Sequence, residues 1–346
     1  MKSVRKKIIR CASAFLTIAV LTTGCSIGGK NIRLTTGLSD SELFKIDGSA
    51  FKVSEAMLFL TTEKNLYEDS YGAEIWTRSI GDITFEEYVK NSVKNRLAEI
   101  KTLTLLAEEK KIKLSNEEKE LAKADAKEYF EGLTKEEKNY MNVDEDMVYK
   151  VYKEYRLAEK VYTEIVKDVN PEISDADAKV IKVAAIYAKT YTIDSSGERV
   201  ECTDEEKASA KESISKLLDA VNNGEDFMTV AANNTDADRV EYQFGKGEMI
   251  KEFEDVAYAL KAGQISGVIE TSDGYYVIKC ISDYLEDETQ KNKEQIIEEK
   301  KNEAFKEIYN PFVEELSSQF NEKVWEKIKF SEMSDIKVSN FYECMD

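Results

Sequence analysis

Helix-start signals recur along the chain and constrain its fold. A Ser or Thr followed three residues later by Glu is the capping-box pattern, in which each side chain bonds the backbone amide of the other residue. Such pairs include Thr84 and Glu87, Ser115 and Glu118, Thr134 and Glu137, and Thr203 and Glu206. The sequence therefore predicts a series of amphipathic helices, from one capped by Ser54 to one ending near Ile165. A small hairpin around Asp47 and Gly48 is predicted before them. Helix packing explains most of their apolar stripes, and an uncovered part would form a binding groove.

The pattern changes after Pro171, one of only two prolines among the 346 residues. The sequence then predicts a strand over 180–191, helices over 203–222, 227–233 and 251–260, and a hairpin over 263–284. Charged helical sequence resumes after Glu286 and continues to Phe330, and Pro311 either starts a fresh helix or kinks a continuing one. We expect an α+β unit of about a hundred residues, inserted into a helical module built from both ends of the chain.

The predicted hairpin ends the inserted unit. Ile265–Ile269 and Tyr275–Ile281 are runs rich in β-branched and aromatic residues, and a Ser-Asp-Gly turn signal stands between them. Because side chains alternate between the two faces of a strand, one of the adjacent residues Tyr275 and Tyr276 is expected to point inward.

The N-terminus is typical of an export signal. Residues 2–10 are basic, Cys11–Leu21 form an apolar segment too short to span a bilayer, and small residues precede Cys25. Leu21–Cys25 also resembles a bacterial lipobox, whose Cys becomes the lipidated first residue of the mature chain; ordinary secretion with cleavage nearby is the alternative. The expected order is a signal peptide over 1–24, a lipidated tether over 25–42, a helical segment over 43–178, the inserted domain over 179–285, and a second helical segment over 286–346.

Net charge argues against one class of partner. The formal charge is −19, although the first 24 residues carry only positive charges. Nucleic-acid binding needs a basic surface that neutralises phosphates, so no nucleic acid is expected as a partner. An acidic surface also repels anionic lipid headgroups. Attachment to a membrane would therefore depend on acyl chains at Cys25.

The chain contains no histidine, which removes several kinds of chemistry. Ser-His-Asp and Cys-His nucleophile systems, His-ligated zinc and the usual proton shuttle near neutral pH all need that residue. Glycine loops for nucleotide phosphates are missing as well. Cys202, Cys280 and Cys344 have no CxxC spacing, and their pairing cannot be predicted. We expect neither a cofactor nor a metal, and any chemistry would be non-covalent or carboxylate-based.

Several blocks of the inserted unit resemble the parvulin-type peptidyl-prolyl isomerases. In order they are Ile181–Ile186, Asn223–Phe227, Val230–Ala232, Gly245–Met249, Phe253–Leu260, Gly263–Gly267 and Gly274–Lys279. The layout resembles the extracytoplasmic foldase lipoproteins of Gram-positive bacteria (PrsA type), which are related in plan to SurA. Lys45–Gly48 and Lys110–Lys113 are more weakly similar to the chaperone module of that family. The resemblance implies an α+β fold in which N- and C-terminal segments form a helical chaperone module with an inserted parvulin-like domain.

The resemblance also implies an apolar cup that grips the proline ring of a peptide. It places Met249 and Phe253 in this cup, with Phe244 beside them. Core packing explains Phe244 nearly as well as a role in the cup, and it is the alternative for the other two residues.

The polar side of the site departs from the family pattern. The two usual histidines correspond to Ala185 and Tyr276, and the usual Cys or Asp corresponds to Ala237, next to Asp236. Thr271 stands where the family often carries a hydroxyl. Tyr276, Thr271 and Asp236 are therefore the candidate catalytic residues, although an exposed loop carboxylate is an equally good interpretation of Asp236.

The sequence is compatible with two functions. Rotation about an X-Pro bond is slow because its barrier is about 18 to 20 kcal/mol, and an isomerase accelerates it by binding the twisted amide best. The first function is an isomerase within a lipid-anchored foldase that acts on unfolded or nascent exported polypeptides at the extracytoplasmic face of the membrane. The alternative is a holdase, whose helical module binds clients while the parvulin-like domain is catalytically weak or silent. A solute-binding lipoprotein is disfavoured, since two large α/β lobes are not visible.

Overall fold

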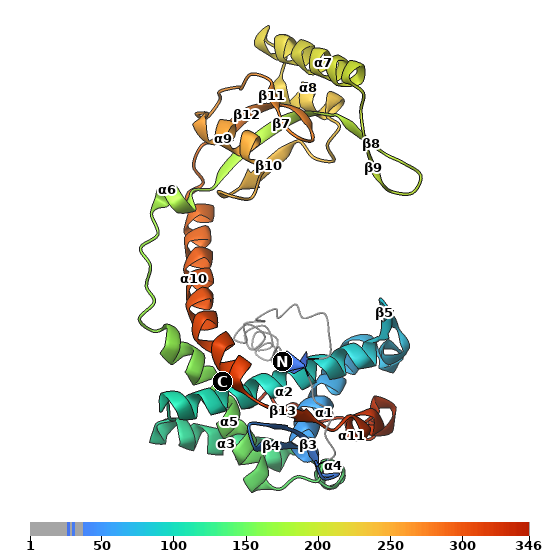
Figure 1. The fold of residues 1–346 in the computed structure, drawn as a ribbon, viewed down its shortest axis with the longest axis vertical. Coiled ribbons are helices and arrows are strands. Elements are labelled where there is room, and N and C mark those ends of the chain that lie inside the picture. The colour runs from blue at the N-terminus through green and yellow to red at the C-terminus, as the bar shows by residue number, and fades with distance from the viewer. Residues whose placement is uncertain (1–25, 28–29, 32–36, 346) are drawn as a thin grey trace, which may run out of the picture. The chain divides into compact units, whose positions relative to one another are not determined.

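The computed structural model describes residues 26–27, 30–31 and 37–345 (Figure 1). The expected signal peptide and Cys25 lie outside the described residues. The chain divides into two compact units, one made of residues up to 168 together with 303–346, and the other of residues 169–302. The second unit is therefore inserted in the sequence of the first, which confirms the predicted arrangement. No helix in the described ranges has the length and apolar character needed to cross a bilayer.

The first unit is mainly helical. Its helices are α1 (Val53–Tyr71), α2 (Phe85–Lys110), α3 (Asn116–Gly132), α4 (Lys135–Met141), α5 (Glu145–Val166), the end of α10 (Glu286–Glu315), and α11 (Glu322–Lys327), with short 3-10 helices η2 (Ala73–Thr77) and η3 (Phe330–Met333). The three predicted capping boxes start α2, α3 and α4. The prediction that Ser54 caps α1 is wrong, because the helix begins at Val53 directly after a strand. Pro311 lies inside the continuous helix α10.

Both ends of the chain contribute to a three-stranded sheet in this unit. β3 (Glu42–Ile46) and β4 (Ser49–Lys52) form the predicted hairpin, and Asp47 and Gly48 at its turn have φ angles of 44° and 80°. β13 (Ser318–Phe320) then pairs antiparallel with β3. Shorter pairings join β1 (Ser26–Ile27) to β2 (Lys30–Asn31), and β5 (Ser79–Ile80) to β6 (Ile83–Thr84). The strand β13 replaces part of the helix that the sequence predicts up to Phe330.

Buried groups hold the segment that follows η3. The carboxylate oxygen Oε1 of Glu137 accepts hydrogen bonds from the backbone amides of Lys337, Val338 and Ser339, at 3.2, 2.9 and 3.2 Å. The other oxygen accepts from the Thr134 amide at the start of α4, at 2.9 Å. The ring of Phe341 is fully buried against Phe59, Tyr129, Tyr152 and Tyr155. The C-terminal segment is therefore part of the core of this unit.

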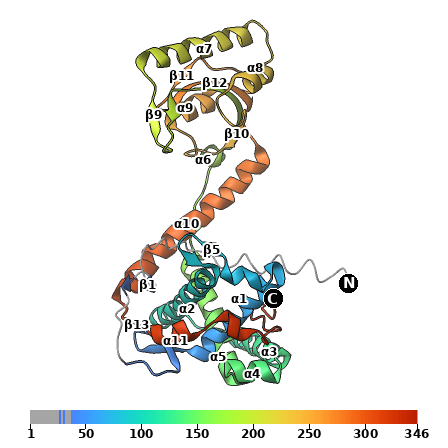
Figure 2. The ribbon, with the colours of Figure 1, turned by 90° about the vertical axis from the view of Figure 1, so that its right-hand side faces the viewer.

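The second unit is an antiparallel sheet covered on both faces. Its strand order is β10 (Glu241–Phe244), β7 (Ile181–Lys189), β12 (Gly274–Ser282) and β11 (Ile269–Glu270). Helices α7 (Asp204–Asn222) and α8 (Phe227–Asn234) cover one face and α9 (Lys251–Ala259) covers the other, while the short α6 (Asp175–Ala178) precedes β7 (Figure 2). The predicted capping box at Thr203 starts α7. A hairpin of β8 (Tyr191–Ile193) and β9 (Arg199–Glu201), which the sequence did not predict, follows β7.

The predicted hairpin over 263–284 is present with a shorter first strand. β11 covers only Ile269–Glu270, and Ile265 makes a single bridge to Lys279. The alternation along β12 separates the two tyrosines. Tyr275 packs with the core under α7 and α8, whereas Tyr276 packs with the core under α9.

Removing the Glu137 carboxylate tests how strongly the C-terminal segment is held. We expect Glu137→Ala to lower the free energy of unfolding of the first unit by about 2 to 4 kcal/mol, because the backbone amides of residues 337–339 lose their buried acceptor. Urea unfolding measures this loss, and limited proteolysis should cut after η3 more quickly. The neighbouring Glu136 is exposed. An equal loss in the matched control Glu136→Ala would contradict this interpretation.

Candidate functional site

The candidate site lies on the α9 face of the four-stranded sheet. Tyr276 of β12 pairs with Tyr187 of β7, and Ile278 pairs with Ala185. Side chains two residues apart on a strand share a face, so all four lie on the same side of the sheet. The positions to which the family resemblance assigns histidines, 185 and 276, therefore share this face.

A stacked tyrosine pair occupies the site. The rings of Tyr276 and Tyr187 are 4.5 Å apart at their centroids and 20° from parallel, and the ring of Phe253 meets Tyr276 edge-on at 5.1 Å. The hydroxyl of Tyr187 donates a hydrogen bond to the carbonyl of Asp273, at 2.7 Å. Tyr187 was missed in the sequence, although its position two residues after Ala185 on a predicted strand was the available signal.

Both tyrosines of the pair keep their protons at neutral pH. Burial, helped by the nearby Tyr242 and Asp273, raises the pKa of Tyr276 to about 12. Burial is also the main cause that raises the pKa of Tyr187, and the neighbouring Tyr276 adds to it. The hydroxyl of Tyr276 is therefore a hydrogen-bond donor rather than a base.

The apolar candidates lie next to this pair at different depths. Phe253 is fully buried and Phe244 is 3% exposed, with 5.8 Å between their ring centroids. Met249 is half-buried and packs against the same cluster, as does Tyr242, whose ring meets Phe253 edge-on at 6.0 Å. Phe244 and Phe253 thus form a buried floor, and Met249, Tyr242 and Tyr276 are among the partly exposed side chains that pack against it.

A carboxylate fixes the loop that carries Met249. The Oε2 atom of Glu254, on α9, accepts hydrogen bonds from the amides of Gly247 at 2.8 Å and Met249 at 3.5 Å. Gly247 has a φ angle of 83°, which a residue with a side chain rarely adopts. The local backbone therefore sets the position of Met249 at the rim of the floor.

The side chains of the other two candidate catalytic residues make structural contacts with the backbone. The Thr271 hydroxyl donates to the Gly274 carbonyl at 2.9 Å and accepts from the Asp273 amide at 3.2 Å, within the β11–β12 turn. The exposed Asp236 accepts from the amide of Lys189 at 3.0 Å, at the end of β7. Of the six predicted site residues in this unit, Tyr276, Phe244, Met249 and Phe253 pack in one cluster. Thr271 and Asp236 contact the backbone at its edge, where the Asp236 amide donates to the Tyr187 carbonyl at 2.9 Å.

The arrangement offers binding rather than bond-making chemistry. Its exposed components are an apolar rim and a phenolic donor, and the side chains around it include no histidine. Among the described residues, no group of three or more Cys, Asp or Glu side chains is placed to hold a metal ion. An extended apolar segment with an amide group is the kind of ligand that such a surface accommodates.

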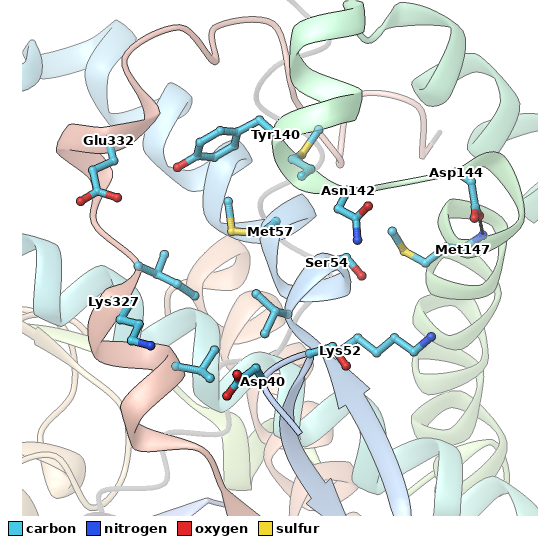
Figure 3. A pocket seen from close by; sticks show the side chains of 15 residues that line it. Asp40, Lys52, Ser54, Met57, Tyr140, Asn142, Asp144, Met147, Lys327 and Glu332 are labelled. Carbon is cyan, nitrogen blue, oxygen red and sulfur yellow. Dashed lines mark hydrogen bonds between the residues drawn. The ribbon is translucent and has the colours of Figure 1, made fainter. Parts of the chain in front are cut away.

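A separate pocket lies within the first unit. Its volume is about 690 Å³, and its lining comes from the start of α1, the α4–α5 turn and α11 (Figure 3). Met57 and Met147 contribute thioethers, while Tyr140, Asn142 and Lys327 add polar groups. Methionine side chains adapt to ligands of different shape, so this pocket is a second candidate for binding polypeptide.

Comparison with known proteins finds similarity both for the inserted unit and for longer stretches of the chain. The family model described as "Rotamase: PPIC-type PPIASE domain" matches residues 196–282. Over 253 residues the chain is 26% identical to "Foldase protein PrsA" of Caldanaerobacter subterraneus subsp. tengcongensis, covering 70% of this chain and 74% of that protein. Over 200 residues it is 28% identical to "Foldase protein PrsA 3" of Bacillus cereus, covering 54% and 60%.

Two further matches are weaker, one because it is short and the other because its sequence identity is low. A stretch of 37 residues is 60% identical to "Peptidyl-prolyl cis-trans isomerase pin1" of Schizosaccharomyces pombe, covering 11% of this chain and 21% of that protein. The crystal structure of the peptidylprolyl isomerase PrsA from Bacillus cereus is 22% identical and covers 78% of this chain and 97% of that chain, with a TM-score of 0.36.

The raised pKa of the tyrosine pair predicts a loss of stability in alkali. Each tyrosine of the pair has a pKa of about 10 in the unfolded chain and a higher pKa in the folded one. Its contribution to stability is fully present below about pH 10 and is lost as the pH rises through the folded pKa. For Tyr276 this loss of stability is expected between about pH 10 and about pH 12. The urea midpoint of the second unit should therefore be flat up to about pH 9 and fall above pH 10.

The variant Tyr276→Phe should reduce this fall, because the phenyl ring keeps the stacking and removes the ionisation. Part of the fall should remain, since burial also raises the pKa of Tyr187 and of Tyr258 in the same unit. The exposed Tyr284 serves as the control, and Tyr284→Phe should leave the fall as it is. A fall of the same size in Tyr276→Phe as in the unchanged protein would contradict the assignment.

Proposed function

We propose that this relative of the PrsA foldases, which carries a PPIC-type rotamase domain, is a membrane-anchored extracytoplasmic foldase whose inserted domain isomerises X-Pro bonds. The observation that carries the proposal is the rotamase match over residues 196–282, which contains the floor of Phe244 and Phe253 and the donor Tyr276. Its clients would be unfolded or nascent exported polypeptides with proline-containing segments.

The proposed reaction requires no covalent step. A proline ring would rest against Met249 and Tyr242 above the buried floor, which leaves the amide before it near Tyr276. Rotation decouples the amide nitrogen from the carbonyl, so the twisted amide is less planar and has a different hydrogen-bonding capacity from either ground state. A site that binds this form better than the planar forms lowers the barrier.

Tyr276 is the proposed donor to the carbonyl oxygen of that amide. The stacking on Tyr187 and the edge contact with Phe253 restrict its ring, so little conformational freedom is lost when a ligand binds. Thr271 and Asp236 would act only through the backbone that they hold, since their polar atoms already have partners in the turn and at the end of β7.

Catalysis can be tested with a proline tetrapeptide and the chain without residues 1–25. We expect exchange between cis and trans forms, measured by NMR, to be faster than the uncatalysed rate. Tyr276→Phe should lower kcat/KM by about three- to tenfold, which corresponds to the loss of one hydrogen bond. The control Tyr284→Phe should leave the rate unchanged. Exchange at the background rate in the unchanged protein would refute the isomerase.

Holding unfolded clients is the second candidate function. The pocket lined by Met57 and Met147 in the first unit favours it, because such a surface can bind polypeptide without an active rotamase domain. Suppressed aggregation of a denatured client, together with background prolyl exchange, would support this function alone.

The anchor can be tested independently of both activities. Lipid at Cys25 would partition the full chain into the detergent phase of a phase-separating detergent, since acyl chains bind at about 0.8 kcal/mol per buried methylene. Cys25→Ala, expressed in a host that exports and lipidates such chains, should move to the aqueous phase. Equal partition of both forms would exclude lipidation at Cys25.

A further inference from the structure

An exposed aromatic surface, which the isomerase site does not use, lies in the first unit. The rings of Tyr67, Tyr71, Trp76, Phe85 and Tyr88 form a connected cluster, here called the aromatic patch. They come from the end of α1, from η2 and from the start of α2. Their centroid separations are 6.4 Å for Tyr67 and Tyr71, 6.0 Å for Tyr67 and Trp76, 5.0 Å for Tyr67 and Phe85, 5.7 Å for Trp76 and Phe85, and 6.0 Å for Phe85 and Tyr88.

The outer rings of the patch are accessible and the inner ones are fixed. Tyr71 is 66% exposed and Tyr88 is 47% exposed, whereas Trp76 is buried and packs edge-on against Phe330 at 4.5 Å. Ile80 and Ile83, which face each other across the β5–β6 hairpin before α2, are exposed as well. A grouping of large exposed apolar side chains on a rigid base is typical of an interaction surface.

The aromatic patch lies in an acidic segment of the chain. The segment from 66 to 88, which carries it, contains six acidic residues and a single basic residue, Arg78. Asp69, Glu74 and Asp82 are exposed, and in the part of the chain that the structure describes they form no ion pair. Lysines from neighbouring elements do not offset them all. Lys90 is buried and donates to the carbonyls of Trp325 and Ile328. The hydrogen bonds from Thr84 are the main cause that lowers the pKa of Glu87, and the positive charge of Lys329 adds to this effect.

We propose that the aromatic patch docks segments of unfolded polypeptide that combine apolar or aromatic side chains with Lys or Arg. Tyrosine faces attract cations, and the carboxylates of the segment extend that attraction over the rim. The inference rests on the proposed foldase function, because it names the chemistry of the clients that the helical module prefers.

The same charges disfavour the other occupants of an exposed apolar surface. A second copy of the chain docked through this surface would bring two acidic rims together, which is repulsive in a symmetric interface. An anionic bilayer would meet the same carboxylates. A basic, apolar peptide satisfies both the rings and the rim.

The binding test uses the chain without residues 1–25 and a fluorescein-labelled twelve-residue peptide of alternating Lys and Phe or Leu. A second peptide with Gln in place of Lys serves as the probe of charge. We expect the anisotropy titration to give tighter binding of the Lys peptide. Tyr71→Ser with Tyr88→Ser should weaken the binding of the Lys peptide by about tenfold.

A charge variant tests the contribution of the carboxylates to binding separately from that of the aromatic rings. Asp69→Asn with Glu74→Gln and Asp82→Asn should weaken binding of the Lys peptide and leave binding of the Gln peptide unchanged. The matched control Leu121→Ser removes an exposed apolar side chain of α3, outside the patch, and should change neither affinity. Circular dichroism confirms that each variant is folded.

Distinct outcomes overturn the proposal. Equal affinity of the ring variant and the unchanged protein for the Lys peptide, a preference for the Gln peptide, dimerisation lost in the ring variant, or binding to anionic vesicles lost in the ring variant would each refute it. Prolyl exchange and suppression of aggregation are measured on the same samples. Their persistence beside failed peptide docking would separate a failure of this inference from a failure of the proposed function.

Discussion

The pairing of β13 with β3 is the contact on which the architecture depends. It joins a C-terminal strand to the N-terminal hairpin, with Phe320 opposite Phe44 and Ser318 opposite Ile46. Because the sheet of the first unit is incomplete without its last strand, the chain between the two parts must leave that unit and return to it. The inserted unit, by contrast, has its own two cores on either side of one sheet. The two units therefore differ in how much of the chain each needs before its sheet is complete.

The tyrosine pair changes the acid–base chemistry of the site more than its shape. The family resemblance implies imidazoles at positions 185 and 276. Here Tyr276 stacks on Tyr187 instead, and the small Ala185 sits two residues before Tyr187 on the same face of β7. The rings supply contact area with few rotatable bonds, which suits recognition of an apolar segment. What they do not supply is a group that exchanges protons near neutral pH. Any acceleration of rotation would have to arise from shape and from one donated hydrogen bond.

Local patterns predicted much of the fold, and non-local contacts account for what was missed. The capping boxes located the starts of α2, α3, α4 and α7, because a cap depends on residues three apart. The alternation of side chains along a strand is also a local property, and it placed Tyr275 and Tyr276 on opposite faces of the sheet. The strand β13 has no local signature, since its partner is far away in sequence. Likewise, the depth of Phe253 depends on the sheet beneath α9, and the hydrogen bonds of Thr271 depend on the exact turn, so a sequence can nominate these residues but cannot assign their surroundings.

The absence of histidine has a consequence for the conditions under which this chain can work. A site whose polar group is a phenol with a pKa near 12 has the same charge in mild acid, at neutral pH and in mild alkali. At the extracytoplasmic location proposed for this chain, the medium is not buffered by the cell. With no imidazole to titrate, the tyrosine pair would present an incoming polypeptide with one unchanging protonation state as that medium acidifies.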